Sequence, residues 1–243
     1  MGNKPIKQHL ENAQRTGVLQ LEDFSLKELP AKILEARQQL RTLNLAGNHF
    51  DILPSFLGEF TSLKYLTLDR NRLQYIPDEI GNLKKMETFS ASSNHLSGLP
   101  LSIGQLSNLK TINLSHNRFR EFPLALCQLP NLDVLDLSSN KIQQLPDREE
   151  IENLSVLELN LNQNQLNTLP SRLAQCRRLK VLRVEENCLP LDVFRNDEQR
   201  ILTDSNISLL AVNGNLFDLN DFRQLSGYEK YMERFTETKK KMG

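Results

Sequence analysis

The feature of this 243-residue chain that most constrains its fold is an asparagine that returns about every 23 residues. Consecutive asparagines of this series are 23, 23, 23, 23, 24, 23 and 28 residues apart. The same apolar template precedes each of them, as Leu40, Leu43 and Leu45 precede Asn48, and a further apolar residue follows two positions later. A fixed period of this length predicts a stack of similar structural units. The series is Asn48, Asn71, Asn94, Asn117, Asn140, Asn164, Asn187 and Asn215.

The spacing within one unit predicts a short strand followed by an outer return segment. Leu43 and Leu45 alternate with Thr42 and Asn44, so the leucines point inward and the polar residues outward. A unit of this size cannot bury its own leucines, but stacked units form one parallel sheet over a continuous core. A proline follows the asparagine by six residues in the first six units, at Pro54, Pro77, Pro100, Pro123, Pro146 and Pro170. We expect an irregular or short helical return there, wider than the strand, so that the stack curves.

The asparagine itself lies where the chain turns away from the strand. Its side-chain amide can both donate and accept hydrogen bonds. One amide in each unit can therefore pair with turn backbone that neither strand nor helix satisfies. We predict that the eight asparagines form a ladder along the stack.

The ends of the chain predict two caps. Residues 18–217 comprise a degraded first repeat, with Phe24 in the asparagine position, followed by eight repeats. Before them, residues 1–17 contain Ile6, Leu10 and Ala13 at helical spacing, which predicts an amphipathic N-terminal capping helix. Residues 218–243 carry Phe and Tyr residues at helical spacing and end in a basic tail, which predicts a C-terminal capping helix.

These motifs resemble the leucine-rich repeat family, and the 23-residue unit with Leu-Pro resembles its intracellular, Ras-group type. The resemblance implies an α/β solenoid, with a curved parallel sheet on the concave side and short helical or irregular segments on the convex side. The tail from Gly227 to Lys241 and the Met-Gly-Asn start also resemble a group of small lipid-anchored leucine-rich repeat proteins without an assigned activity. That second resemblance implies where the protein lies in the cell, at a membrane, but it implies no biochemical activity.

Composition excludes several classes of protein. The 30 basic and 30 acidic residues cancel, which argues against nucleic-acid binding through bulk charge. No apolar run reaches the roughly 18 residues of a membrane span, and the polar start carries no signal peptide. The three cysteines form no C-x-x-C, so neither a disulfide framework nor a zinc site is expected. We expect a monomeric, soluble protein of a reducing, intracellular compartment.

The sequence offers no constellation for catalysis, a metal or a cofactor. His49 and His95 occupy equivalent positions two repeats apart, roughly 10 Å from each other, too far to share a metal ion. No glycine-rich phosphate loop, G-x-S-x-G or H-E-x-x-H motif occurs. We therefore expect a protein that is not an enzyme and that binds no cofactor and no metal.

The outward strand positions form the one extended surface that is left for a partner. Tyr65 with Asp69 and Arg70 is one candidate anchor, since Tyr and Arg are frequent in binding hot spots. Such a face has no stacked aromatic residues, which disfavours single-stranded nucleic acid. Alternatively, these are ordinary solvated side chains and the contacts lie in the loops. The later repeats supply a second, more acidic group, with Asn113, Asp136, Glu158, Asn160, Arg183 and Glu185.

The Met-Gly-Asn start makes Gly2 a candidate site for a lipid. Removal of Met1 would expose this glycine for N-myristoylation, although the usual pattern has Ser or Thr where this chain has Ile6. The competing interpretation makes Asn3 a helix cap. One myristoyl chain binds membranes only marginally, so a second signal is needed, and Lys4 and Lys7 are nearest.

The sequence thus favours a non-catalytic intracellular scaffold that binds a protein on its concave sheet. The resemblance makes acylation of Gly2 the expected tether, which would place the chain on the cytoplasmic face of a membrane and in the cytoplasm. The alternative is a soluble regulatory subunit or adaptor for a phosphatase or a small GTPase, partners that Ras-group repeats serve in related proteins.

Overall fold

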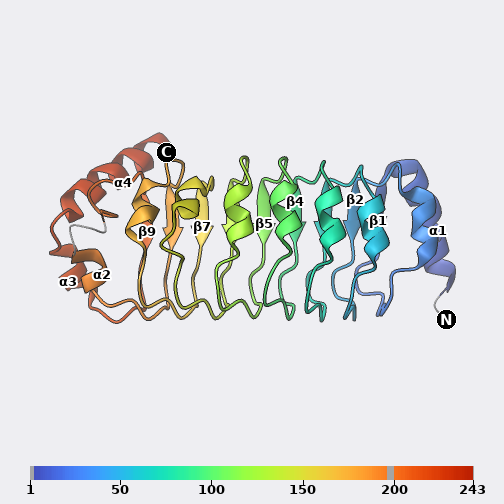
Figure 1. Ribbon diagram of the computed structural model, residues 1–243, viewed down its shortest axis with the longest axis horizontal. Coiled ribbons are helices and arrows are strands. Elements are labelled where there is room, and N and C mark those ends of the chain that lie inside the picture. The colour runs from blue at the N-terminus through green and yellow to red at the C-terminus, as the bar shows by residue number, and fades with distance from the viewer. Residues whose placement is uncertain (1–2, 196–199, 243) are drawn as a thin grey trace.

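The computed structural model describes residues 3–195 and 200–242, and these form one elongated stack of coils (Figure 1). Within this part of the chain, each coil contributes one three-residue strand, and nine strands pair in sequence order in a single parallel sheet. The predicted open, curved sheet of a repeat solenoid is confirmed. The strands are β1 Val18–Gln20, β2 Thr42–Asn44, β3 Tyr65–Thr67, β4 Thr88–Ser90, β5 Thr111–Asn113, β6 Val134–Asp136, β7 Glu158–Asn160, β8 Val181–Arg183 and β9 Leu209–Ala211.

The register of the sheet follows directly from the apolar template. Each strand pairs with the next without a slip, so that Leu43 lies beside Leu66 and Leu66 beside Phe89. The central residue of every strand is buried, whereas its two neighbours point outward. A slip by one residue would place a row of leucines in water, and for this reason the register is fixed.

The convex side of the stack is made of short 3₁₀ helices. A proline precedes six of the seven that the described residues contain, and its fixed φ near −65° aims the chain into the turn. Gly58 packs so closely that a Cβ there would lie 2.7 Å from the Cβ of Glu79 in the next coil. These helices are η1 Ala31–Ala36, η2 Ser55–Glu59, η3 Asp78–Asn82, η4 Leu101–Gln105, η5 Leu124–Gln128, η6 Glu149–Asn153 and η7 Ser171–Gln175.

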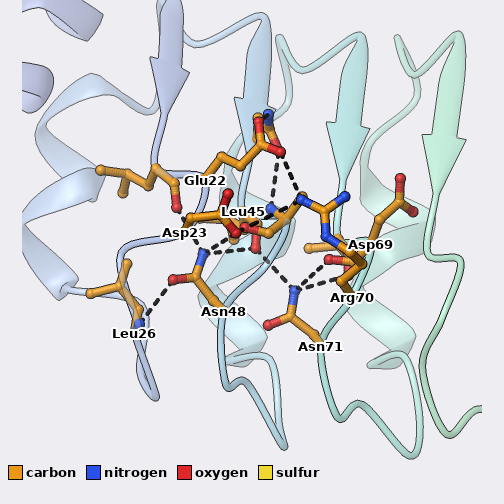
Figure 2. Close-up of polar contacts among 12 residues, drawn as sticks. Glu22, Asp23, Leu26, Leu45, Asn48, Asp69, Arg70 and Asn71 are labelled. Atoms are coloured by element: carbon orange, nitrogen blue, oxygen red, sulfur yellow. Dashed lines mark hydrogen bonds and ion pairs between the residues drawn. The ribbon is translucent and has the colours of Figure 1, made fainter.

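Each repeated asparagine bonds both its own coil and the coil before it. Asn71 donates from Nδ2 to the carbonyl oxygens of Leu68, in its own coil, and Leu45, in the preceding one, both at 2.9 Å. Its Oδ1 accepts from the Phe50 backbone N–H at 3.1 Å. The other seven repeated asparagines likewise donate to, and accept from, backbone groups of the preceding coil. Figure 2 shows the donated and accepted bonds of Asn48 and the donated bonds of Asn71.

The residue before each of these asparagines adopts a left-handed conformation. Glycine occupies the position only in the first and last of the eight repeats, at Gly47 and Gly214. At Gly47 a Cβ would lie 1.7 Å from Oδ1 of Asp23, so a larger residue there would require this exposed carboxylate to move. In the other six repeats an ordinary residue accepts a positive φ of 53–56°, which costs on the order of 1 kcal/mol each. These six are Arg70, Ser93, His116, Ser139, Gln163 and Glu186.

A single helix covers the first coil. Helix α1, Asn3–Thr16, runs antiparallel to β1 and buries Leu10 and Ala13 against the core. Gly17, with φ of 72°, ends it and donates its N–H to the Ala13 carbonyl. The bounds of α1 include Asn3, which is therefore a residue of the helix itself and not the cap that precedes it.

Two helices, where the sequence predicted one, follow the last coil. After α2, Asp192–Arg195, and β9 come α3, Leu219–Arg223, and α4, Tyr228–Met242. Gly227 separates them, because its φ of 92° interrupts a helix. The Tyr231 hydroxyl accepts from the N–H of Leu210 in β9 at 3.2 Å, which pairs a backbone donor at the open edge of the sheet. No helix in the described segments is long and apolar enough to cross a bilayer.

The ladder generates a prediction about stability. Asn117 is buried and makes four backbone contacts, so Asn117→Ala leaves several buried polar groups unpaired. We expect it to lower the free energy of unfolding by about 2–4 kcal/mol, measured by urea denaturation. Asn108→Ala, which removes one exposed bond to the Lys84 carbonyl, should cost less than about 1 kcal/mol. Equal losses in the two variants would contradict a special role for the buried amide.

Candidate functional site

The concave face of the sheet is built from the outward residues of the strands. Val18, Tyr65 and Val134 begin their strands and are 41%, 43% and 36% exposed. Between them the middle of the face carries small polar residues, such as Thr88, Ser90 and Thr111, which are only half-exposed. The face is therefore shallow, with its larger side chains toward the two ends of the stack.

Polar side chains of the first three coils form one cluster beyond the strand ends (Figure 2). Arg70 reaches back across two coils and donates from Nη2 to Oε1 of Glu22 at 2.8 Å, and the same nitrogen lies 3.8 Å from Oδ1 of Asp23. Asn44 donates to the second oxygen of Glu22 at 3.1 Å. The hydrogen bond from Arg70, followed by that from Asn44, lowers the pKa of Glu22, so its carboxylate is anionic at neutral pH.

The predicted anchor of Tyr65, Asp69 and Arg70 does not lie in one place. Tyr65 begins β3, whereas Asp69 and Arg70 follow its end. Asp69 points along the sheet and accepts from the Ser90 hydroxyl at 2.6 Å and the Ser92 N–H at 2.7 Å. Glu22 and Asn44 were not predicted as site residues, although both occupy outward positions of the repeat that the period locates.

In the later coils, the predicted acidic group is internally bonded. Arg183 pairs with Glu158 through Nε and Oε1 at 2.8 Å, and each side chain stays about one-third exposed. Glu185 accepts from the side-chain amides of Asn162 at 3.0 Å and Asn213 at 2.9 Å. These contacts hold the side chains in place on both sides of β8.

Three further predicted residues support the turn after their own strand. Asn113, Asp136 and Asn160 each end a strand and accept, through Oδ1, from the backbone N–H two residues later, at 3.0, 2.8 and 3.1 Å. This local bond fixes the side chain at the exit of the strand. Their remaining polar atoms are half-exposed on the concave face.

An apolar patch beside the Glu158–Arg183 pair was not predicted. Leu157 is 40% exposed at the position that precedes β7, and it lies diagonally between Val134 and Val181 of the neighbouring strands. The signal was present in the sequence, because the equivalent position is charged in most other repeats, as at Lys64, Glu87 and Lys180.

The described residues show no constellation for covalent chemistry. They contain no group of three or more His, Cys, Asp or Glu side chains arranged to hold a metal ion. Burial raises the pKa of Cys127 and of Cys176 to about 12, so both are neutral thiols at physiological pH. Cys176 fills a core position and donates to the Ile151 carbonyl, while Cys188 is exposed. Gly2, the predicted lipid site, lies outside the described residues.

Comparison with known proteins agrees with this geometry. A leucine-rich repeat model matches residues 92–142, and a second one matches residues 39–60 and 62–83. The matched segments are leucine-rich repeats. The coils outside them follow the same plan, with one strand and one outer turn each, and proteins with such repeats are typically non-catalytic interaction domains.

Solved structures share the leucine-rich repeat solenoid. The crystal structure of a TDR receptor is 27% identical over 82% of this chain, with a TM-score of 0.66, but this match covers only 34% of the receptor chain. An internalin C2 from Listeria monocytogenes is 18% identical over 86% of this chain and 93% of its own, with a TM-score of 0.70. A second Listeria monocytogenes internalin is 22% identical over 83% of this chain and 53% of its own, with a TM-score of 0.62. The chain thus spans a third to a half of the length of two of these three proteins.

Burial predicts unequal reactivity of the three thiols. At about pH 8 we expect a chromogenic disulfide reagent to modify only Cys188 quickly in the folded leucine-rich repeat protein, because the other two thiols are buried and protonated. All three should react in denaturant, and Cys188→Ser should abolish the fast phase. Rapid modification of two or more thiols in the folded chain would contradict the burial of Cys127 and Cys176.

Proposed function

We propose that this leucine-rich repeat protein is a non-catalytic scaffold whose concave face binds a protein partner. The observation that carries the proposal is the continuous concave sheet, on which exposed Tyr65, Val134 and Leu157 lie among side chains already fixed by hydrogen bonds. Pre-ordered side chains lose little conformational entropy when a partner binds. Leucine-rich repeat proteins generally bind protein partners, which agrees with this assignment.

The later coils are the best-supported part of the binding face. There the apolar residues Val134, Leu157 and Val181 lie beside the Glu158–Arg183 pair, whose side chains are about one-third exposed. Apolar and arginine side chains that a partner can desolvate together are typical of binding hot spots. We assign Tyr65 and the Glu22–Arg70 cluster to a second contact area at the other end.

We also propose that the scaffold is tethered through a myristoyl group on Gly2, as a monomer on the cytoplasmic face of a membrane. The support is the Met-Gly-Asn start and the resemblance to the intracellular 23-residue type of the family. One acyl chain gives only reversible attachment, with an association constant on the order of 10⁴ M⁻¹. Such a tether would let the scaffold exchange between membrane and cytoplasm.

The alternative function, a soluble regulatory subunit or adaptor for a phosphatase or a small GTPase, uses the same face. The Glu158–Arg183 pair favours it, because a partly exposed ion pair of fixed geometry can discriminate between partners. The two functions differ in the need for a lipid and in the identity of the bound protein.

Exchange of the ion pair tests the concave face without removing a charge. Glu158→Arg combined with Arg183→Glu keeps the pair and the net charge but inverts the local field. We expect affinity capture from cells to lose the partner at least tenfold. The matched control exchanges Glu152 and Arg172, an ion pair of the convex side, and should capture as well as the natural chain. If both exchanges keep the partner, the concave assignment is wrong; specific loss of a phosphatase or GTPase would favour the alternative.

Metabolic labelling tests the tether. With an alkyne analogue of myristate, we expect the natural chain to be labelled and Gly2→Ala to be unlabelled and shifted from the membrane fraction to the soluble fraction. The glycine is required because the acyl amide forms on its free amino group after removal of Met1. Equal labelling of the two chains would remove Gly2 as the attachment site.

A further inference from the structure

The two long edges of the solenoid differ strongly in charge. The five residues that lead into each of the nine described strands form what we call the strand-start flank. These segments together carry ten Lys or Arg residues and three Asp or Glu residues. The flank comprises residues 13–17, 37–41, 60–64, 83–87, 106–110, 129–133, 153–157, 176–180 and 204–208.

The opposite edge provides an internal reference. The five residues after Phe24 and after each ladder asparagine, which we call the strand-end edge, carry five Lys or Arg and five Asp or Glu residues. The formal charge is therefore +7 on the flank and zero on the strand-end edge, in a chain whose total is zero. Repeat packing requires neither value, because the charged side chains of both sets lie at the surface, whereas the apolar ones fill the core. The segregation of charge thus points to a ligand on the flank.

Most of the flank cations are exposed and lie outside ion pairs, although Arg37 donates to the Leu34 carbonyl and Lys84 to the Gln105 side chain. Within the described residues, Lys64 and Lys110 both pair with Glu87, at 2.7 and 3.6 Å, and Arg178 pairs with Asp133 at 2.7 Å. The other seven cations take part in no ion pair among these residues, and all seven are exposed; they are Arg15, Arg37, Arg41, Lys84, Lys85, Arg177 and Lys180.

Both capping helices end on the same side. Helix α1 ends beside the start of β1, and Figure 1 shows α4 rising to the level of the strand starts, opposite the edge where α1 begins. Arg234 of α4 donates to the carbonyl of Ile207, a flank residue, at 3.0 Å. Exposed Lys239 and Lys240 lie in the last turns of α4 and extend the row of cations beyond the last coil.

The shape of the flank suits a flat anionic surface better than a nucleic acid or a protein groove. Its cations are spread along roughly 40 Å of stacked strands at one edge of the solenoid, and among the described residues of the flank only Arg177 and Arg178 line a hollow. Its only aromatic residue, Phe60, is buried, so no side chain can stack on a base.

We propose that the strand-start flank docks the solenoid on a bilayer that contains anionic phospholipid headgroups. In this orientation the stack lies along the membrane, and the concave sheet stands perpendicular to it and open to a partner. Each cation close to such a surface strengthens binding about fivefold. The attraction extends over about 8–10 Å at physiological salt, so all exposed flank cations contribute and high salt weakens docking.

This inference does not rest on the proposed acylation. Helix α1 begins at the strand-end edge and ends at the flank, so a lipid placed before α1 and the flank would approach a membrane from different sides. The chain without an acyl group therefore isolates the contribution of the flank. Failure of acylation at Gly2 and failure of flank docking are separate results.

The test is sedimentation of the full, unacylated chain with vesicles of phosphatidylcholine alone or mixed with phosphatidylserine. We expect binding only to the mixed vesicles, weakening as salt rises. Arg41→Glu with Lys85→Glu and Lys180→Glu should lower the affinity about 100-fold or more. The matched control places the same three reversals on the strand-end edge, at Arg72, Arg118 and Lys141, and should bind within about threefold of the natural chain.

The two triple variants have the same net charge, and circular dichroism reports whether both are folded. None of the six side chains makes a side-chain hydrogen bond or ion pair among the described residues, so both variants should retain the solenoid. Absence of binding to the mixed vesicles, or equal loss in both variants, would overturn the proposal. Binding of a labelled duplex DNA in place of the vesicles, abolished by the flank variant, would overturn the lipid assignment.

Discussion

Every coil of this solenoid depends on an amide that belongs to two coils at once. The ladder asparagine leaves the strand and immediately satisfies backbone groups of its own turn and of the turn before it. A backbone N–H or carbonyl buried in a turn is costly to leave unpaired, and water does not reach it. The amide thus allows a three-residue strand to end abruptly inside a core, and it fixes the spacing of neighbouring coils. The left-handed residue before each asparagine is a cost that these bonds offset.

Hydrogen bonds within and between coils also determine which side chains of the concave face are available to a partner. Several polar side chains that would otherwise be free to contact a partner are already engaged, either with their own turn, as in Asp136, or with the next coil, as in Asp69 and Glu185. These hydrogen bonds restrict the conformations of the polar side chains on the face. We therefore expect a protein partner to contact mainly the few larger residues that remain exposed. Of these, Tyr65 and Leu157 lie toward opposite ends of the stack.

Charge is sorted along the solenoid in a way that the core does not require. The strand-start flank is strongly basic, the strand-end edge is neutral, and the acidic excess lies elsewhere, for example around η6 with Glu149, Glu150 and Glu152. Equivalent positions of successive repeats lie in a row along the solenoid. If one such position is often basic, the basic side chains therefore form a continuous charged surface. One chain can thereby present a protein-binding sheet and a differently charged edge at right angles.

The sequence by itself determined the repeat, the register and the inward set of leucines, because a strict period leaves only one way to bury them. It also located the asparagines at which the coils turn. Only the tertiary structure decided which polar side chains meet across coils: Arg70 finds Glu22 from 48 residues away, and Gly227 divides the C-terminal cap into two helices. Periodicity states which residues share a row, but the direction of a long side chain within that row depends on the neighbours that surround it.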